Sequence, residues 1–462
     1  MKELLLKYVE NKKVAILGFG REGRSTLNLL MDIGGYGSID ILDQNPVEAI
    51  DGVATVCGEE YQDSLNNYDL VIKSPGIVLK DEISNYSCKI LSQTEIFFER
   101  YKKQIIGITG TKGKSTTTTL IYHILKNAGY DTVLGGNIGI PAFDIIGQIK
   151  ENTIIVFEMS SHMLEYMTVA PHIGVLMNIH EEHLDHYGTM EKYVNAKMNI
   201  IKNQEKDDIC FVNKDIEVEA VSELIHISAN DAASEQEMET TLYNEVIIDD
   251  SKIYFELKGC KYYYEIPIDS VKLIGAHNYF DIGIAYGILK LKGLSDEEFE
   301  KGLISYEPLP HRLQFIGEVN EVKFYDDSIS TICDTTIQAL QSIKNADTVL
   351  IGGMDRGIDY SELIAYLSES HVRNIILMYE TGKRIWSEIN DKYNDFNHKD
   401  RIHLVEDLEE AVELAMSITE KGKSCIMSPA AASYGYFKNF EERGDKFAQL
   451  VNLYKNKNIA KK

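Results

Sequence analysis

The sequence contains few cysteines, and none of them is arranged as in a disulfide framework or a zinc site. Its 462 residues include six cysteines, scattered along the chain without a CxxC pair. Isolated thiols of this kind are typical of reduced cytoplasmic proteins rather than of secreted ones. The chain starts with Met1-Lys2-Glu3, and charge this early does not fit a secretory signal peptide. We therefore expect a cytoplasmic protein.

A long apolar run and an excess of basic residues are also missing. No stretch approaches the ~18 apolar residues that a membrane-spanning helix needs. The 72 acidic residues outnumber the 47 basic ones, which gives a formal net charge of −25. Bulk binding of nucleic acid requires basic surface, so we expect neither a nucleic acid nor a membrane as partner. An anionic ligand would have to meet a local group of cations or backbone amides.

The sequence does contain short β-branched runs that alternate with longer segments of helical period. This alternation is typical of parallel α/β units. At about 150 residues per domain, the length suggests roughly three domains. A helix is expected from Ser25. Strands are expected at residues 14–17, 39–43, 70–72, 105–108, 153–157, 173–177, 209–212, 348–351, 374–377 and 424–427. The prediction is an α/β fold with three consecutive domains.

Two breaks in the pattern suggest the domain boundaries. The first lies near residues 101–104, and the second is at Pro308 and Pro310, where two prolines oppose regular structure. We therefore predict domains at residues 1–103, 104–309 and 310–462. Between about residues 215 and 272 the sequence pattern changes: Tyr, Ile and Val occur in alternation, and acidic turns separate these runs. This pattern predicts a small antiparallel β insert in the central domain.

A first glycine motif, Gly18–Gly23, follows a predicted strand and precedes a predicted helix. It reads GxGxxG, and Asp43 comes twenty residues after Gly23. Glycines allow the backbone to approach a phosphate at a helix N-terminus, and the acidic residue can bind a ribose or a base. The pattern fits a tight strand–helix turn equally well. Taken alone, it would also suggest an NAD-dependent oxidoreductase, but that hypothesis leaves the next motif unexplained.

The second motif is more specific: Gly110-Thr111-Lys112-Gly113-Lys114-Ser115-Thr116, directly after a predicted strand. The strict P-loop spacing fails, because Ile108 stands five residues before Gly113. The chemistry still fits, since glycines permit an amide-lined loop and the following helix presents its positive end. Lys114 can neutralise β- and γ-phosphate charge, and Ser115 can ligate Mg²⁺. These residues predict a nucleotide triphosphate site.

Further ligand-type residues follow the P-loop. Glu158 ends the predicted strand at residues 153–157, the position of a Walker-B-like Mg²⁺ ligand. His180, His183 and His186 form an HxxHxxH pattern, but one helix does not easily direct three imidazoles at one zinc ion. We expect one member of this cluster to serve a phosphate-linked Mg²⁺. Lys197, taken alone, would be an exposed helix lysine.

Together these motifs resemble the Mur ligases, the ATP-dependent amide-forming enzymes of peptidoglycan precursor synthesis. The resemblance extends almost from end to end. It rests on residues 18–23, 74–76, 109–115, 135–139, 158–161, 182–185, 197, 275–278, 310–312, 326–328, 428–433 and 437–444. The first and last of these segments are most similar to the glutamate-adding members. Folylpolyglutamate synthase, a relative with a similar ATP domain, has no counterpart of the N-terminal domain, so the presence of residues 1–103 argues against that alternative.

The resemblance implies a role for each of the three predicted domains. The first would be Rossmann-like and bind UDP rather than NAD, the second would be a P-loop ATPase-type domain, and the third would be a Rossmann-like domain that binds the amino acid. The implied UDP-substrate residues are Gly20, Arg21, Glu22, Gly23, Asp43, Gln44, Asn45, Ser74 and Asn137. The implied ATP residues are Gly110, Thr111, Lys112, Gly113, Lys114, Ser115, Thr116, Asn278, Arg312 and Asp327.

The remaining implied roles concern catalysis, Mg²⁺ and the amino acid. Lys114, Asn137, His183 and Lys197 would be catalytic, with Lys197 carbamylated as in the family. The implied metal ligands are Ser115, Glu158, His183 and Lys197. The implied amino-acid residues are Thr331, Arg356, Ser433, Tyr434 and Phe440.

The resemblance predicts that ATP and Mg²⁺ are used to join glutamate to UDP-N-acetylmuramoyl-L-alanine through an acyl phosphate. D-glutamate is the expected enantiomer, an L-glutamate-adding relative is the alternative, and a monomer is expected. The chain departs from the family at four positions. Lys112 replaces a usual Asn, His162 a common Gln, Ile329 a usual Lys, and Arg356 the Lys of some members. The last two concern the amino-acid pocket.

Overall fold

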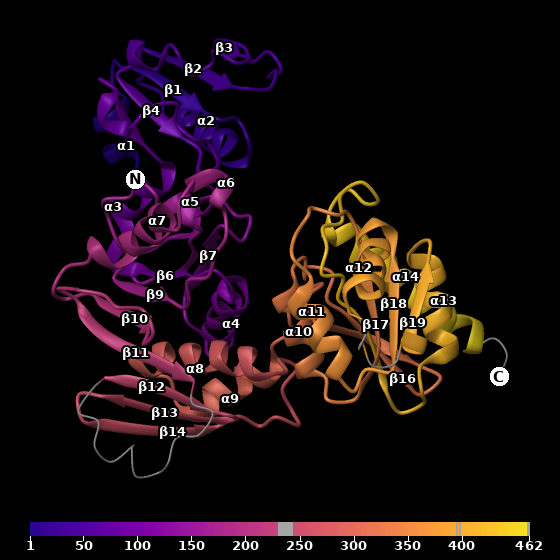
Figure 1. The fold of residues 1–462 in the computed structure, drawn as a ribbon. Helices are drawn as coiled ribbons and strands as arrows, with labels where there is room; N and C mark the ends of the chain where they lie inside the picture. Colours follow the sequence, from indigo (N-terminus) through magenta and orange to yellow (C-terminus); the bar gives the residue numbers. More distant parts are fainter. Residues whose placement is uncertain (230–243, 394–395, 397–398, 460–462) are drawn as a thin grey trace. The chain divides into compact units, whose positions relative to one another are not determined.

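The strands of the described part of the chain form three sheets (Figure 1). The computed structural model describes residues 1–229, 244–393, 396 and 399–459. The chain divides into two compact units. The first comprises residues 1–271 and 279–306, and the second comprises residues 272–278 and 307–462. The mixed α/β architecture predicted from the sequence is confirmed, whereas the domain boundaries at residues 103 and 309 stay a prediction.

The first sheet is parallel throughout, in the order β3-β2-β1-β4-β5. Its strands are β1 (Lys13–Leu17), β2 (Ser38–Asp43), β3 (Ala54–Cys57), β4 (Leu70–Lys73) and β5 (Lys89–Leu91). The associated helices are α1 (Lys2–Val9), α2 (Arg21–Ile33) and α3 (Gln93–Tyr101). The predicted start of α2 at Ser25 is wrong. The helix begins at Arg21, because Gly20 adopts an extended conformation at the N-cap and the next residue already turns into the helix.

The second sheet has the order β14-β13-β12-β11-β10-β9-β6-β8-β7. Its strands are β6 (Ile105–Thr109), β7 (Thr132–Gly136), β8 (Ile154–Glu158), β9 (Ile173–Leu176), β10 (Ile209–Asn213), β11 (Glu223–Ala229), β12 (Glu245–Asp249), β13 (Lys252–Leu257) and β14 (Cys260–Glu265). The associated helices are α4 (Lys114–Asn127), α5 (Ser161–Leu164), α6 (Leu184–Tyr187), α7 (Met190–Lys202), α8 (Ala276–Leu291) and α9 (Asp296–Ser305).

The predicted antiparallel insert needs a correction. β13 and β14 are antiparallel as expected, but β11 and β12 run parallel to β10 and continue the central sheet. Period-two alternation indicates a half-buried strand without specifying its neighbour, so pairing to the central sheet could not be read from the pattern. Residues 230–243 of the predicted insert lie outside the described residues.

The first two sheets share one apolar core. Phe97 and Phe98 of α3 are fully buried and contact Phe157 of β8. Their ring centroids lie 5.7 Å and 5.3 Å from that of Phe157. Aromatic pairs at such distances add to the burial of their large apolar surfaces. This shared core explains why both sheets belong to one compact unit and positions the glycine turn relative to the P-loop.

The second unit contains the third sheet, in the order β15-β16-β20-β17-β18-β19. Its strands are β15 (Gln314–Val319), β16 (Val322–Asp326), β17 (Ala346–Gly352), β18 (Asn374–Met378), β19 (Ile402–Val405) and β20 (Ser424–Met427). Only β15 is antiparallel to its neighbour among these described strands. The helices are α10 (Cys333–Ser342), α11 (Ser361–Glu369), α12 (Tyr379–Lys392), α13 (Leu408–Ile418) and α14 (Phe440–Ile459). No helix in the described ranges combines the length and apolarity needed to cross a bilayer.

Candidate active site

The N-terminal glycine motif forms a close turn between β1 and α2. Gly18 has a φ of +88°, which favours glycine, and a Cβ on Gly23 would lie 2.2 Å from the Gly18 carbonyl oxygen. The Ser74 hydroxyl donates to that same carbonyl at 2.8 Å. Both oxygens of Asp43 accept backbone amides, from Phe19 at 2.6 Å and from Asn45 at 2.8 Å. The structure thus brings the turn, Ser74 and Asp43 together, and Asp43 fixes the backbone at Phe19 and Asn45.

Two charged residues of this turn face the neighbouring elements. Arg21 Nη1 donates to the Gly139 carbonyl at 3.0 Å, in the loop that follows β7 and carries Asn137. Glu22 Oε2 accepts a hydrogen bond from Gln93 Nε2 at 3.0 Å. Burial raises the pKa of Glu22 to about 7. The turn is therefore tied to the central sheet by Arg21 and to α3 by Glu22.

The P-loop runs from β6 into α4. Gly113 has a φ of +83°, and a Cβ there would lie 2.6 Å from Oδ1 of Asp281. Asn178 Oδ1 accepts from the amides of Thr111 and Lys112, both at 2.8 Å. Sequence reasoning missed Asn178, since an Asn after a strand gives no signal of its own. Asn178 thereby fixes the loop at the N-terminus of a 14-residue helix, a position suited to phosphate.

Two lysines meet at one carbonyl of this loop. Lys114 Nζ donates to the carbonyls of Gly110 and Thr111, both at 2.9 Å, and Lys197 Nζ donates to Gly110 at 2.7 Å. Lys197 is only 1% exposed, so the expectation of an exposed helix lysine is wrong. α7 lies against β6 and β9 and directs this residue inward. Burial, reinforced by Lys114, lowers the pKa of Lys197 to about 7.

Glu158 fits the role of a Mg²⁺ ligand. Its Oε1 accepts a hydrogen bond from Asn137 Nδ2 at 2.7 Å, and the residue is 1% exposed. Its Oε2 is buried and has no hydrogen-bond partner among the described residues. Leaving a buried acceptor unpaired is costly, so an unpaired carboxylate oxygen beside a phosphate loop suits a hard cation that prefers oxygen ligands.

The histidine pattern does not form a three-histidine centre. His183 has a φ of +57° and precedes α6. The His162 ring lies edge-on to His183 and His186, at centroid distances of 4.7 Å and 4.3 Å. The His180 amide instead donates to the Thr111 hydroxyl at 2.9 Å. Over the described residues, no group of three His, Cys, Asp or Glu side chains is arranged to hold a metal ion.

The departure at Lys112 has a partner in the same region. Lys112 Nζ lies 3.3 Å from Glu182 Oε1, next to His183 in the chain. Burial alone would raise the pKa of Glu182, but Lys112, Lys114 and His183 outweigh it and hold that pKa below its ordinary value. The additional charge in the phosphate loop is therefore compensated by a carboxylate.

The second unit contains the remaining predicted nucleotide residues. Asp327 is buried and accepts hydrogen bonds from the Ser428 hydroxyl at 2.7 Å and the Leu313 amide at 3.1 Å. Burial raises its pKa to about 7. Asn278 Nδ2 donates to the Ile274 carbonyl at 2.7 Å. Arg312 follows His311, whose Nδ1 lies 2.7 Å from Asp326 Oδ2.

The predicted amino-acid residues lie at the carboxyl end of the third sheet. Arg356 Nη2 donates to the Thr331 carbonyl at 3.0 Å, which brings these two together. Ser433 is buried and Tyr434 is exposed, both in the loop after β20. Phe440 begins α14, and its carbonyl accepts from the Ser328 hydroxyl at 2.7 Å. Ligands of parallel sheets bind at this end of the strands.

Arg443 connects the two loops of this region and was not among the predicted site residues. It is fully buried. Its Nε and Nη2 donate to the hydroxyl and carbonyl of Ser328 at 3.0 Å and 2.8 Å, and its Nη1 donates to the Ala431 carbonyl at 3.0 Å. A cation in the first turn of a helix opposes the helix dipole. From the sequence, this unfavourable position was the one indication that Arg443 is held by groups outside its own helix.

Two family models match the chain. "Mur ligase middle domain" matches residues 108–288, and "Mur ligase, glutamate ligase domain" matches residues 311–431. The chain is 33% identical over 467 residues to UDP-N-acetylmuramoylalanine–D-glutamate ligase of Clostridium botulinum (strain Loch Maree / Type A3), covering 96% of this chain and 97% of the relative. The ligase of the same name from Clostridium acetobutylicum is 32% identical over 471 residues, with coverage of 97% and 98%.

Solved structures show the same fold at low identity. UDP-N-acetylmuramate-alanine ligase MurC from Thermotoga maritima aligns with a TM-score of 0.57 and 16% identity, covering 96% of this chain and 99% of that one. MurF ligase from Thermotoga maritima in complex with ADP has a TM-score of 0.57 and 17% identity, with coverage of 99% and 100%. These likenesses extend over all three sheets.

Proposed function

Because the chain belongs to the Mur ligase family, we propose that it joins D-glutamate to UDP-N-acetylmuramoyl-L-alanine at the expense of ATP. The observation that carries this proposal is the P-loop. Lys114 and Lys197 meet at the Gly110 carbonyl, and Glu158 nearby in the same sheet has a buried, unpartnered oxygen. Near-full-length identity to enzymes named for the D-glutamate reaction supports the choice of substrates.

The first chemical step is phosphoryl transfer. The alanine carboxylate attacks the γ-phosphorus of ATP, the bond to the β-phosphate oxygen breaks, and an acyl phosphate and ADP result. Two anions must approach each other, so the Lys114 ammonium and the loop amides reduce the repulsion and the developing charge. Mg²⁺ would be held by Ser115, Glu158 and His183, and it would supply further charge neutralisation.

The second step forms the amide. The glutamate amine attacks the activated carbonyl, phosphate leaves, and the amine loses a proton. The two glutamate carboxylates need charge-assisted partners, for which Arg356 and the hydroxyls of Thr331 and Ser433 are suited. Phe440 would contact the methylenes. Asn278, Arg312 and Asp327 serve the nucleotide in this proposal.

We also propose that Lys197 is carbamylated and contributes to the metal site. Its ammonium is buried, hydrogen-bonded to a carbonyl that Lys114 also uses, and has no carboxylate within ion-pair distance among the described residues. A buried cation in these surroundings is costly, which favours the neutral amine that reacts with CO₂. The carbamate would replace a cation by a carboxylate-like oxygen ligand.

The Lys197 proposal is tested with two variants of the same helix. Lys197→Ala should abolish phosphate release, and short carboxylates should restore part of it. Lys192→Ala, at an exposed position of α7, serves as the control and should retain activity. Incorporation of ¹³CO₂, followed by NMR of the wild-type protein, reports the modification directly. A wild-type enzyme that is active without a carbamate signal contradicts the proposal.

The reaction itself is tested by ATP-dependent phosphate release with UDP-N-acetylmuramoyl-L-alanine and each glutamate enantiomer. Release should require both substrates, and kcat/KM should be higher with D-glutamate, because a site that pairs both carboxylates discriminates by geometry. Equal or better kcat/KM with L-glutamate would select the alternative, for which the Ile329 and Arg356 departures are the motivation. No release with either enantiomer would refute the ligase proposal.

A further inference from the structure

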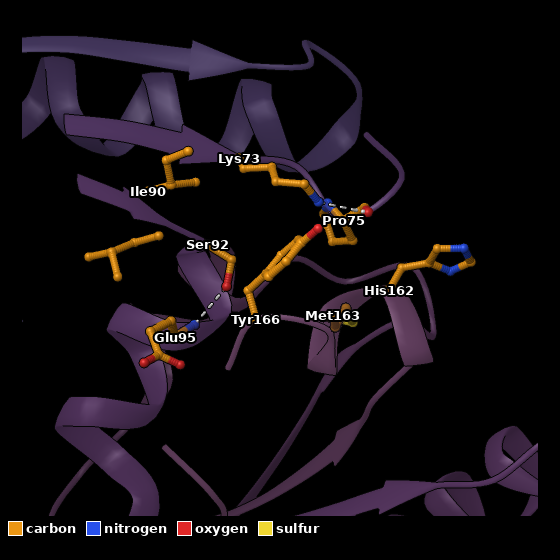
Figure 2. Close-up of a pocket in the computed structure, with 9 residues that line it drawn as sticks. Lys73, Pro75, Ile90, Ser92, Glu95, His162, Met163 and Tyr166 are labelled. Carbon is orange, nitrogen blue, oxygen red and sulfur yellow. Dashed lines mark hydrogen bonds between the residues drawn. The ribbon is translucent and has the colours of Figure 1, made fainter. Parts of the chain in front are cut away.

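Lys73 is a buried cation at the end of β4, next to the Ser74-Pro75-Gly76 loop. The residue is 4% exposed. It lines a pocket together with Pro75, Ser92, Glu95, His162 and Tyr166. Figure 2 shows Lys73 and Tyr166 extending toward each other from opposite walls and meeting beside Pro75. The Lys73 Nζ lies 5.3 Å from the centroid of the Tyr166 ring.

The hydrogen bonds of Lys73 orient the loop that follows it. Nζ donates to the carbonyls of Ser74 at 3.3 Å and Pro75 at 3.2 Å. In a trans peptide the N–H points opposite to the C=O, so anchoring the Pro75 carbonyl turns the Gly76 N–H away from Lys73. Gly76 is exposed, and no described residue accepts a hydrogen bond from its amide. The loop therefore presents a fixed, unpaired donor.

This loop belongs to the N-terminal glycine turn. The Ser74 hydroxyl donates to the Gly18 carbonyl at 2.8 Å, so the two segments are joined directly. The same turn precedes α2, whose N-terminus favours anions. Lys73 therefore stands directly behind a surface that combines a helix N-terminus, a glycine turn and an oriented amide.

The charge of Lys73 is not neutralised at short range. Among the described residues, no carboxylate lies within ion-pair distance of Nζ. Glu22 of α2 and Glu165, which follows α5, act on it only through longer-range attraction. A buried cation without a direct counter-ion is unfavourable by itself and becomes favourable when an anionic ligand binds close to it.

We propose that Lys73 is a positioning residue for the diphosphate of the UDP-linked substrate, fixing the Ser74–Gly76 loop and supplying unpaired positive charge behind it. The inference rests on the proposed function for the identity of the substrate. It goes beyond that function by assigning substrate affinity to a residue that the P-loop chemistry does not use. The role concerns binding of one substrate rather than phosphoryl transfer.

The test compares Lys73→Met with Lys89→Met. Methionine preserves most of the side-chain length of Lys73 and removes its charge and donors. Lys89, on the adjacent strand β5, is the matched control, because its Nζ lies 4.5 Å over the Tyr8 ring but the residue is exposed. Lys73→Met should raise the Kd for UDP, measured by calorimetry, and the KM for the UDP-linked substrate about tenfold or more. Its kcat and its KM for ATP should stay within about twofold, and Lys89→Met should match the wild type.

Direct binding of UDP separates this inference from the proposed function. If the wild type binds UDP but does not turn over the muramoyl substrate, the ligase proposal fails while the role of Lys73 is still measured. An unchanged UDP Kd in folded Lys73→Met overturns the inference, as does an equal rise of all KM values. If Lys73→Met does not fold by circular dichroism, Lys73→Gln replaces it. Gln keeps a donor and loses the charge, so the Kd of Lys73→Gln for UDP should rise at least threefold. An unchanged Kd would also overturn the inference.

Discussion

If the buried oxygen of Glu158 is a Mg²⁺ ligand, replacing Glu158 by Gln should raise the stability of the metal-free protein and lower its activity. Gln has nearly the same shape, and its Oε1 can still accept the 2.7 Å hydrogen bond from Asn137. The change is confined to the other oxygen, which is buried without a partner among the described residues. In Glu158→Gln this position carries a neutral amide that cannot ligate a cation.

The expected magnitudes follow from these two oxygens. A buried acceptor without a partner costs about 1–3 kcal/mol, and more when it is charged. The amide group that takes this position in Glu158→Gln is uncharged but also lacks a partner, so only the cost of the buried charge is removed. The metal-free first unit should therefore gain about 1 kcal/mol, which corresponds to a rise in Tm of about 2–4 °C. Loss of one electrostatic stabiliser of the transition state costs about 3–4 kcal/mol, so phosphate release should fall by about 10²–10³-fold.

The assay needs both readouts on the same preparation. Thermal unfolding is followed in the presence of a chelator, and phosphate release is measured with Mg²⁺, ATP and both substrates. Glu151→Gln, at an exposed position just before β8, is the control and should change neither quantity. A metal-free Glu158→Gln protein that is less stable than the wild type, or one that retains near-normal turnover, would refute the assignment of this oxygen to Mg²⁺.

Three further predictions concern other parts of the chain. Lys114→Ala should stay folded by circular dichroism and lose phosphate release by about 10²–10³-fold, because its ammonium offsets phosphate charge; near-normal turnover would contradict this. Arg443→Met leaves three buried acceptors without their donor, each costing about 1–3 kcal/mol, so it should lower the free energy of unfolding of the second unit by about 3 kcal/mol or more and raise the KM for glutamate, whereas Lys446→Met should change neither by a comparable amount. Asp208 is buried, but the Glu205 amide, His172 and Lys103 hold its pKa below the ordinary value, so its stabilising effect is present above about pH 4 and is lost as the pH falls further. The difference in urea unfolding between wild type and Asp208→Asn should therefore be large at pH 7 and shrink at pH 3, and a pH-independent difference would contradict the reasoning.

The elements with local signals were predicted well from the sequence. The runs at residues 14–17, 105–108 and 424–427 are strands of three different sheets, and their residues are fully or almost fully buried. Parallel strands covered on both faces must be apolar along their whole length, so they can be recognised without knowledge of their partners. The start of α2 was placed four residues too late, because the cap at Gly20 depends on backbone conformation rather than on a capping side chain.

The candidate site was only partly accessible to such reasoning. Gly110–Thr116 is contiguous, so its phosphate-binding character could be read directly, and the family assignment is confirmed. The environment of Lys197 could not be read, because a lysine in a helix is usually exposed and only the packing of α7 on β6 and β9 buries it. Arg443 and Asn178 were missed as well, because Ser328 and the loop at Thr111 and Lys112, to which they hydrogen-bond, are distant in the sequence.

What the sequence by itself determined is the α/β fold class, the order of the motifs and the family, because apolar periodicity and contiguous glycine-rich loops are local properties. Only the tertiary structure decided that β11 and β12 extend the central sheet, that Glu158 retains one unpartnered oxygen, and that Lys73 is buried without a direct counter-ion. Strand pairing, burial and the balance of charge depend on which distant segments meet. The residues in question look the same in sequence whether they are solvated or enclosed, and it is their enclosure that changes their pKa values and hydrogen bonding.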